Sequence, residues 1–468
     1  MMTERPFFKK ILLFAIPVTL TGLLQIVYNT ADTAVVGRFA GKTALAAVGS
    51  TGSMIGLIVN LFTGLSMGAG VLTARMLGAK DKPGVRQAVH TAMGLSVLSG
   101  FVIAVIGILI SPTLLRWMQA PADTIDLSTL YVRIYFLGAP GAMIFNFGAA
   151  IIRSTGDTRR PLQYLAASGI LNIALNLFTI VVLHWGVAGV AIATISSQYL
   201  TAVLTVRYLR KTTMDIHLDL GGVRFHKASL LEILRIGVPA GIQNALFSIS
   251  NVIIQSNVNS FGSDAMAGIS AGSNYDAYIY ISTNGFAQAA MTFTSQNVGA
   301  RKPENLRRIW LVSVGSASIA ALTLQTIGFL LREPIVSLFS TDPAVIAVGT
   351  QRMALIMPFF IFCSLLDVTG GAVRGLGRSF QIMLVSLFGA CGLRLIWVFF
   401  FLPMQRTLPF LYISYPLSWG VTFAVAAGLF LYLTTPKQIA AIMDKAAAAA
   451  EEQALQAPEE AEERTVES

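Results

Sequence analysis

The chain has few charged residues for its length. Only 12% of its 468 residues are Asp, Glu, Lys or Arg, and 54% are hydrophobic. Soluble domains carry about 25% charged residues, so this composition excludes an ordinary soluble domain. With a mean hydropathy of +0.68, the chain is predicted to be an integral membrane protein.

Cysteine and histidine are also scarce. The two cysteines, Cys363 and Cys391, both lie within apolar runs. We interpret them as small buried hydrophobic residues rather than as a disulfide or a metal site. The four histidines are scattered, and the sequence contains no metal-ligand spacing. We therefore expect no bound cofactor.

The net charge of +10 does not indicate a nucleic-acid partner. The basic residues occur in short clusters between apolar runs, as the determinants of membrane topology do. Most of them fall on the side of the membrane that holds the N-terminus. The positive-inside rule then predicts that both termini lie in the cytoplasm. We expect a multi-pass protein in contact with lipid, in the plasma membrane of a bacterium.

About twelve apolar segments are long enough to cross a bilayer, for which about 20 residues suffice. The first follows a basic stretch but is longer than the core of a secretory signal, so we expect it to be retained as a helix. The twelve ranges are 8–37, 43–72, 87–110, 126–152, 160–183, 187–208, 229–258, 266–297, 305–331, 344–373, 379–403 and 410–434.

The two halves of the chain resemble each other. Residues of the first half recur in the second at an almost constant separation: Pro17 as Pro239, Asn29 as Asn251, Arg153 as Arg374 and Gly156 as Gly377. Six helices per half is an even number, so both halves enter the membrane from the same side. The sequence therefore predicts parallel repeats, a recurrent design of transporters.

The repeat and the polar stretches define the expected domains. We predict a first lobe at 1–210, a polar linker at 211–228 and a second lobe at 229–436. The remaining tail, 437–468, is rich in Ala and Glu. Because it has nothing obvious to pack against, we expect it to be disordered.

The first apolar segment carries a line of polar residues. Gln25, Tyr28, Asn29 and Asp32 follow one another at i, i+3, i+4 and i+7, which is one face of a helix. An ionised Asp inside a membrane helix costs about 2.5–3.5 kcal/mol, so it usually faces a cavity or a partner. The alternative is a helix end where Asp32 contacts headgroup water, since Arg38 lies six residues on.

Other helices carry charges too. Asp276 lies toward the outer end of its segment, and Asp367 lies about seven residues before Arg374 and thus within the hydrocarbon. Asp367 would alternatively be satisfied by backbone donors. Arg394 is a cation deep in an apolar run, which would either extend its head to the interface or pair with a carboxylate. Asp367, on the preceding helix, is its nearest candidate partner.

Uncharged polar residues mark further helix faces. Asn172 and Asn176 are four residues apart in the fifth segment, where they would serve either as contacts between helices or as ligands. Thr194 in the sixth segment would most simply bond to its own backbone. Gln243 and Asn251 in the seventh segment repeat the polar line of the first, but without an acid.

Two motifs suggest enzymes only superficially. The stretch 37–43, GRFAGKT, has three residues between its glycines, whereas a phosphate-binding loop needs four. Gly64-Leu65-Ser66-Met67-Gly68 matches a nucleophile elbow but lies within a helix rather than at a strand-to-helix turn. Gly64 and Gly68 instead predict close helix packing, and we expect no enzyme activity.

The residues discussed above resemble those of a known family. The run IPVTLTGLLQIVYNTADTAVVGRFAGKTALAAVGS resembles the first helix and following loop of MATE (multidrug and toxic compound extrusion) transporters. VPAGIQNALFSISNVIIQSNVNSFG, with the later FTSQNVGAR, resembles the start of that family's second lobe. The resemblance covers roughly 8–434. It implies two six-helix lobes that form a V-shaped central cavity, and export of organic cations in exchange for protons or sodium ions by alternating access.

The resemblance also implies a coupling site. Asp32 matches the first-helix Asp of the family's N-lobe cation site, and Asn172, Asn176 and Thr194 match its fifth-helix pair and sixth-helix Thr. These four residues would hold the coupling proton or a sodium ion. Asn176 stands where some members have Asp, which leaves one carboxylate in the site. Asp367 matches the tenth-helix Asp of a C-lobe site, but the seventh helix has no acid to complete it.

The remaining polar residues within the helices are predicted to line the cavity for small organic cations: Gln25, Tyr28, Asn29, Gln243, Asn251, Asp276, Asp367 and Arg394. The alternative function is that of a lipid-linked oligosaccharide flippase of the same superfamily. Its cavity should be basic to hold a diphosphate, whereas here acids inside the helices outnumber Arg394. We expect the protein to be a monomer.

Overall fold

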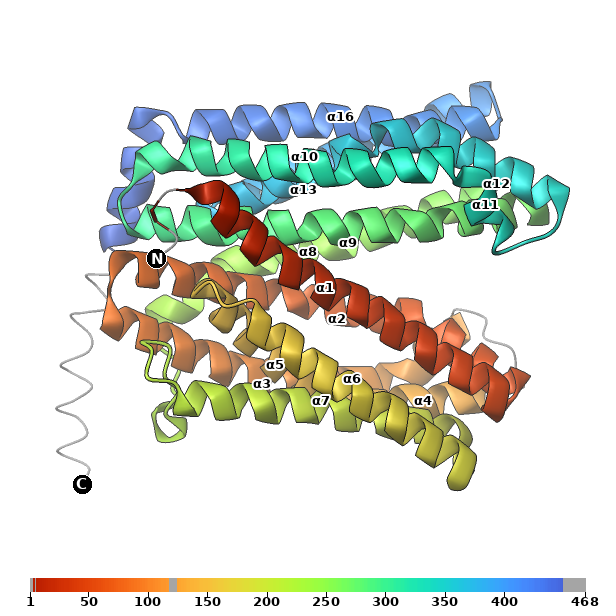
Figure 1. The fold of residues 1–468 in the computed structure, drawn as a ribbon, viewed down its shortest axis with the longest axis horizontal. Helices are drawn as coiled ribbons and strands as arrows, with labels where there is room; N and C mark the ends of the chain where they lie inside the picture. Colours follow the sequence, from red (N-terminus) through yellow and green to blue (C-terminus); the bar gives the residue numbers. More distant parts are fainter. Residues whose placement is uncertain (1–2, 5, 118–123, 449–468) are drawn as a thin grey trace. The chain divides into compact units, whose positions relative to one another are not determined.

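The computed structural model describes residues 3–4, 6–117 and 124–448. These residues form helices joined by short turns, and no strand occurs among them (Figure 1). In the first half of the chain the helices are α1 (Phe7–Val35), η1 (Val36–Ala40), α2 (Lys42–Ala79), α3 (Lys82–Trp117), α4 (Ile125–Leu137), α5 (Ala139–Ser154), α6 (Arg159–Leu177), η2 (Phe178–Val182) and α7 (Gly186–Lys211).

The second half repeats this succession of long helices. Its elements are η3 (Leu220–Gly222), α8 (Lys227–Asn259), α9 (Ser263–Gly299), η4 (Pro303–Asn305), α10 (Leu306–Leu330), α11 (Arg332–Ser337), α12 (Pro343–Ile356), η5 (Met357–Phe359), α13 (Phe360–Gly375), α14 (Ser379–Ser386), η6 (Leu387–Gly392), α15 (Leu393–Ile396), η7 (Trp397–Phe401), η8 (Leu402–Met404) and α16 (Leu408–Leu433).

Most of these helices are long and apolar enough to span a membrane. Nine spans meet this condition among the described residues, and up to eleven do if each of two bent helix pairs is one span. Helices α4 and α5 form one such pair, bent by 45°, where Pro140 cannot donate a backbone hydrogen bond. Helix α9 is long enough but too rich in Ser, Thr, Asn and Gln to qualify, so the count of twelve stays a prediction.

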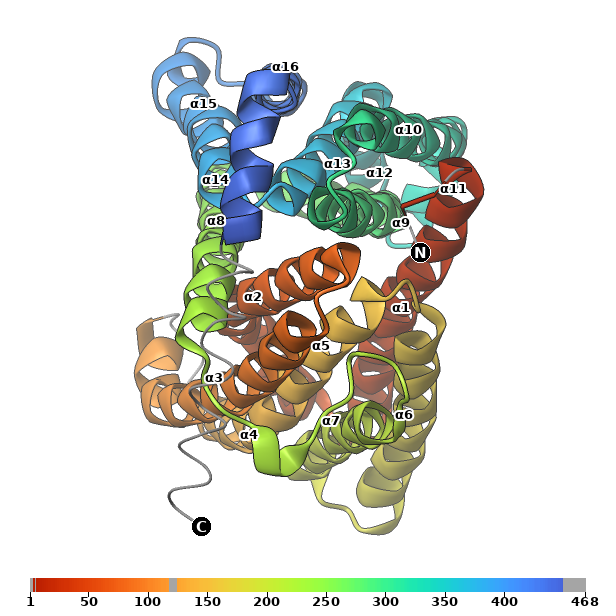
Figure 2. The ribbon, with the colours of Figure 1, turned by 90° about the vertical axis from the view of Figure 1, so that its left-hand side faces the viewer.

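The described helices pack into two compact units. Of the described residues, unit 1 takes those up to Thr19 and Ile242–Ala446, and unit 2 takes Leu20–Gly241. Both boundaries fall inside a long helix, so α1 and α8 each contribute to both units. The sequence repeat divides the chain at the linker instead, and the lobe limits drawn from it stay a prediction. Figures 1 and 2 show α9, α10 and α13 side by side within unit 1.

In unit 2 the glycines of α2 lie directly against α8. A Cβ atom added to Gly64 would overlap the backbone of Gly241, and one added to Gly237 would lie 2.6 Å from the Cα atom of Leu65. A Cβ added to Gly68 would overlap the Ile233 carbonyl oxygen. Small residues thus let the two backbones touch, which confirms the close packing predicted for Gly64 and Gly68.

Unit 1 contains the equivalent contact. Gly285 of α9 is the counterpart of Gly64 in the internal repeat, and a Cβ atom on it would lie 2.6 Å from the carbonyl oxygen of Ala15 in α1. One turn later, the Thr19 hydroxyl donates to the Ser282 carbonyl at 3.2 Å. The duplicated sequence therefore builds the same helix contact twice, once in each unit.

The linker between the halves is fixed to α3. The backbone N–H of Asp219 donates to Nε2 of His90 at 3.1 Å, and that of His226 donates to the Thr91 hydroxyl at 3.1 Å. Ile216 and Leu218 are buried in the core of unit 2. Apolar anchors and side-chain acceptors on α3 thus hold this polar segment.

The expectation of a disordered tail is wrong for its first residues. Residues 436–448 are helical, and Ile439, Ile442 and Met443 are buried in the apolar core of unit 1 together with Phe430. Their i, i+3, i+4 spacing gives the helix the apolar face that it packs with. The rest of the predicted tail, 449–468, lies outside the described residues.

The glycine contact in unit 2 predicts an effect on stability. Gly64→Ala should destabilise the protein by about 1–3 kcal/mol, because the added methyl group overlaps a backbone that cannot move aside easily. Thermal unfolding in detergent measures the change. Gly52→Ala in the same helix is the matched control, since a Cβ there meets no atom within 4 Å. Equal stability of the two variants would contradict the close packing.

Candidate functional site

The predicted coupling residues of α1 and α6 meet in unit 2. The side-chain amide of Asn176 donates to Asp32 at 2.5 Å and to the Asn172 side-chain oxygen at 3.3 Å. Asn176 is 1% exposed and Asn172 is 4% exposed. Because the asparagines are one helical turn apart, both face α1. The structure therefore brings together three of the four residues that the sequence singled out.

A close approach of α1 and α6 positions this cluster. The ring of Tyr28 lies over Gly169, where any Cβ atom would overlap it. The Tyr28 hydroxyl donates to the Ala166 carbonyl at 3.4 Å. Tyr28 precedes Asp32 by one helical turn, so the same face of α1 carries the aromatic contact and the carboxylate.

The cluster offers oxygen atoms to a cation. The side-chain oxygen of Asn176 is buried and has no hydrogen-bond partner, although its amide nitrogen bonds to Asp32. A buried acceptor without a donor is costly, and a proton on Asp32 or a bound cation would satisfy it. Within the described part of the chain, no three His, Cys, Asp or Glu side chains form a group that could hold a metal ion.

Three other predicted residues of unit 2 lie outside this network of bonds. The Thr194 hydroxyl donates to the Val190 carbonyl of its own helix at 3.0 Å, as the simplest interpretation of the sequence expected. Gln25 and Asn29 are exposed, and the Asn29 carbonyl accepts from Thr33 at 2.8 Å. Of the polar line on α1, Tyr28 and Asp32 therefore contact α6, whereas Gln25 and Asn29 are exposed.

Sequence reasoning missed two tyrosines of α4. Tyr131 and Tyr135 interact electrostatically with the Asp32 carboxylate, and their ring centroids lie 6.1 Å apart. Their i, i+4 spacing is visible in the sequence, but nothing there shows that α4 approaches α1. Two aromatic hydroxyls of α4 are therefore within range of the charge of Asp32.

In unit 1, Asp276 forms an ion pair. An Arg352 terminal nitrogen donates to its carboxylate at 2.5 Å, and the two side chains are 6% (Arg352) and 18% (Asp276) exposed. The second carboxylate oxygen of Asp276 is buried without a hydrogen-bond partner. Asp276 is therefore neutralised by a protein cation from α12, a partner that the sequence did not suggest.

Asp367 and Gln243 belong to chains of side-chain hydrogen bonds. Asp367 accepts from the Asn284 amide at 3.4 Å, and Asn284 in turn accepts from Gln288 at 2.9 Å. On α8, Gln243 accepts from Arg374 at 3.0 Å and donates to the Ser386 hydroxyl at 2.9 Å. A side-chain amide, rather than the backbone donors considered in the sequence analysis, thus bonds to Asp367, and a guanidinium and a hydroxyl bond to Gln243.

The predicted pairing of Arg394 with Asp367 is wrong. Arg394 is 4% exposed, and its Nε donates to the Ser418 hydroxyl at 2.9 Å. Its guanidinium lies 4.5 Å from the ring centroid of Tyr415 and 5.1 Å from that of Trp419. Cation–π contacts thus stabilise this cation, and no carboxylate lies within ion-pair distance among the described residues.

The last predicted cavity residue, Asn251, is exposed on α8. Its side chain is therefore not one of the buried polar groups of unit 1.

The fold and the buried polar groups define a class of protein. Long apolar helices, a succession of helices repeated in the two halves and charges held inside the helices are typical of a multi-pass membrane transporter. The sequence model of the MatE family matches residues 17–178 and again 239–400. The chain belongs to this family, and the two matches begin at Pro17 and Pro239, the same pair that opens the internal repeat.

Individual relatives agree with this assignment. The probable multidrug resistance protein YoeA of Bacillus subtilis is 27% identical over 436 residues, which cover 91% of this chain and 94% of YoeA. The probable multidrug resistance protein NorM of Thermotoga maritima is 26% identical and covers 81% of this chain and 82% of its own. A crystal structure of a MATE protein in complex with MaL6 has the same fold, with a TM-score of 0.86, 23% identity, and coverage of 95% of this chain and 98% of that one.

The ion pair of unit 1 predicts non-additive effects on stability. Arg352→Leu alone should cost about 3–5 kcal/mol, because it leaves the Asp276 carboxylate buried without a partner. The double variant Arg352→Leu/Asp276→Leu should recover much of this loss. Thermal unfolding of the single and double variants in detergent tests the coupling, with exposed Arg308→Leu as control. Additive losses would show that the pair is energetically unimportant.

Proposed function

We propose that the protein is a secondary antiporter that exports small organic cations in exchange for protons or sodium ions. The membership of the MatE family and the multidrug-resistance names of its relatives support drug efflux. The observation that carries the coupling step is the contact of the half-buried Asp32 with the buried Asn176. Asp32 lies inside a membrane helix, and no cationic side chain bonds to it among the described residues.

The chemistry of exchange follows from this contact. A carboxylate in a low-dielectric site attracts any cation, and a bound proton or ion cancels the charge that would hold a cationic substrate. Coupling ion and substrate therefore exclude each other, and each favours the conformation in which it binds better. Asn176 keeps the carboxylate oriented, and its free oxygen is available in the neutralised state.

The donor set favours a proton as the coupling ion. Asp32 supplies the carboxylate of the cluster, and the Asn176 side-chain oxygen is its buried unpartnered acceptor. Sodium would need several oxygen ligands, whereas a protonated Asp32 needs only one acceptor, which this oxygen supplies. Asn172 already uses its oxygen to accept from Asn176.

We further propose a monomer in a bacterial cytoplasmic membrane with both termini in the cytoplasm. The bacterial relatives support the location, and the positions of the basic residues support the orientation. The carboxylates of unit 1 are then secondary contributors to substrate attraction, because Asp276 is already paired with Arg352.

One observation favours the flippase alternative. Arg394 is a buried cation without a carboxylate partner among the described residues, and such a group would suit a diphosphate. Two other buried arginines, Arg352 and Arg374, bond to Asp276 and Gln243. The transport assay below distinguishes the two functions.

The central prediction concerns Asp32. In proteoliposomes that hold the purified protein, ethidium should move under an imposed proton gradient but not under an imposed sodium gradient. Asp32→Asn should reduce this movement to that of empty liposomes, because an amide can neither carry nor release the coupling charge. Ethidium fluorescence measures the transport.

The matched control is Asp126→Asn, which removes an exposed carboxylate from the first turn of α4 in the same unit. It should transport like the unchanged protein. Full activity of Asp32→Asn would refute the coupling role. Movement of ethidium under the sodium gradient alone would show that the coupling ion is sodium rather than a proton. No movement under either gradient, in folded protein, would favour the flippase.

A further inference from the structure

Unit 2 contains a groove along the last turns of α7. Its volume is about 560 Å³. The lining residues come from α7, with one residue of α5: Ile144, Tyr199, Ala202, Val203, Val206, Arg207, Arg210 and Lys211. None of them belongs to the Asp32 cluster, so the groove is separate from the site proposed for coupling.

The groove changes character along α7. Ile144, Ala202, Val203 and Val206 make its first part apolar. The Tyr199 hydroxyl donates to the Leu137 carbonyl at 2.8 Å, which holds the ring in place at this apolar end. An apolar channel of this kind on a membrane helix fits an acyl chain.

The other end of the groove is formed by basic residues whose charge no carboxylate neutralises within the described ranges. Arg207, Arg210 and Lys211 are all exposed, and none forms an ion pair with a carboxylate within the described ranges. The linker that follows α7 does contain acids, but they are used elsewhere. Asp215 pairs with Lys82 at 3.7 Å, and Asp219 pairs with Arg86 at 3.7 Å. Three positive charges therefore lie together where α7 leaves the membrane.

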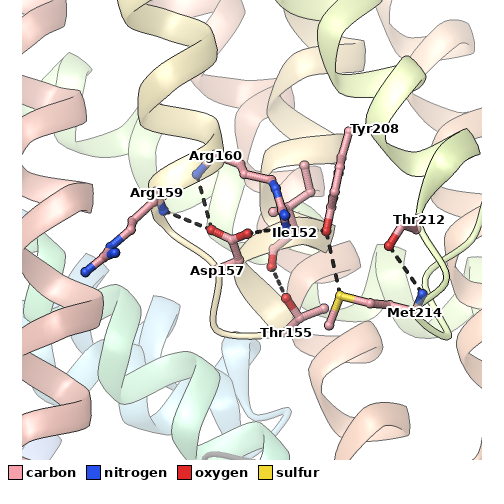
Figure 3. A network of polar contacts seen from close by, with 8 residues as sticks. All are labelled: Ile152, Thr155, Asp157, Arg159, Arg160, Tyr208, Thr212 and Met214. Carbon is pink, nitrogen blue, oxygen red and sulfur yellow. Dashed lines mark hydrogen bonds and ion pairs between the residues drawn. The ribbon is translucent and has the colours of Figure 1, made fainter.

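In contrast to these three residues, the neighbouring Arg160 has bonding partners within the protein and holds this end of α7 in place (Figure 3). Arg160 donates to Asp157 at 2.6 Å and to the Tyr208 hydroxyl at 2.6 Å, and its guanidinium lies 4.3 Å from the Tyr208 ring centroid. Asp157 also accepts from the backbone N–H groups that begin α6. The Arg160 guanidinium is thus bound by groups of the protein itself, and its contact with Tyr208 links the basic turn of α7 to α6.

The repeat does not reproduce this feature. The corresponding end of α16 reads Leu429-Phe430-Leu431-Tyr432-Leu433 and contains no basic residue. A helix end that merely follows the general bias of basic residues toward one side of the membrane would not require three charges in one copy and none in the other.

We propose that this groove binds one anionic phospholipid, with an acyl chain along the apolar part and the phosphate among Arg207, Arg210 and Lys211. Basic pockets at the ends of membrane helices recognise anionic headgroups, and each basic residue near the surface contributes about fivefold in affinity. The headgroup is held by charge and the chain by apolar contact, so a zwitterionic lipid of equal chain length binds much more weakly.

The test titrates the full-length protein in detergent with dioleoylphosphatidylglycerol or dioleoylphosphatidylcholine and counts bound lipid by native mass spectrometry. One phosphatidylglycerol should bind in preference to phosphatidylcholine. The variant Arg207→Gln/Arg210→Gln/Lys211→Gln should lose affinity for it by roughly 100-fold. Arg207→Lys/Arg210→Lys should retain binding, because the charges remain.

The matched control is Arg308→Gln/Lys437→Gln/Lys445→Gln, which removes the same charge from exposed positions of unit 1. It should bind phosphatidylglycerol as the unchanged protein does. Equal binding by the groove variant and the control, at unchanged thermal unfolding temperatures, would overturn the proposal. Equal binding of the two lipids would do so as well. A groove variant that unfolds is replaced by the single variant Arg210→Gln, for which the expected loss is about fivefold.

Discussion

The bilayer imposes the constraint on which this structure depends: a polar group inside it must find its partner within the protein. Helices satisfy their own backbone groups, so the constraint falls on the side chains. Asp276 binds Arg352, Gln243 binds Arg374, and Asp32 binds Asn176. A polar group inside the membrane that lacks such a partner destabilises the folded protein, so its presence points to a functional role. One such group is the Asn176 side-chain oxygen, which has no hydrogen-bond partner. Arg394 does have partners, Ser418 and two aromatic rings, but none of them is a carboxylate among the described residues.

Features that depend on spacing along the chain could be predicted from the sequence. Apolar length predicted the helices, because a span needs a minimum run of residues. The spacing of Gly64 and Gly68 predicted a close helix contact, and the spacing of Asn172 and Asn176 predicted a shared face. Spacing alone did not predict that these asparagines lie next to Asp32, because only the family resemblance related α6 to α1. The structure places the three residues in one hydrogen-bonded cluster.

Features that depend on which helices become neighbours could not be predicted. Nearness in sequence suggested Asp367 as the partner of Arg394, but α16 supplies Ser418, Tyr415 and Trp419 instead. Likewise, no local pattern shows that α12 brings Arg352 to Asp276. The helix at 436–448 is a different case, because the spacing of its buried residues was visible. Its many alanines obscured the short apolar face.

The repeat explains why the two units share a scaffold but differ in chemistry. A backbone contact such as that of Gly64 with Gly241 tolerates only small residues, so its counterpart at Gly285 and Ala15 stays equally close. The side chains of a cation site carry no such requirement. In the first helix of each half, where Pro17 recurs as Pro239 and Asn29 as Asn251, Asp32 corresponds to Ile254. Ile254 is 2% exposed in an apolar core. Unit 1 thus has hydrocarbon where unit 2 has a carboxylate. A cationic coupling ion would find no ligand in the Ile254 side chain and would be attracted by Asp32, so these two equivalent positions differ in chemistry although they share a scaffold.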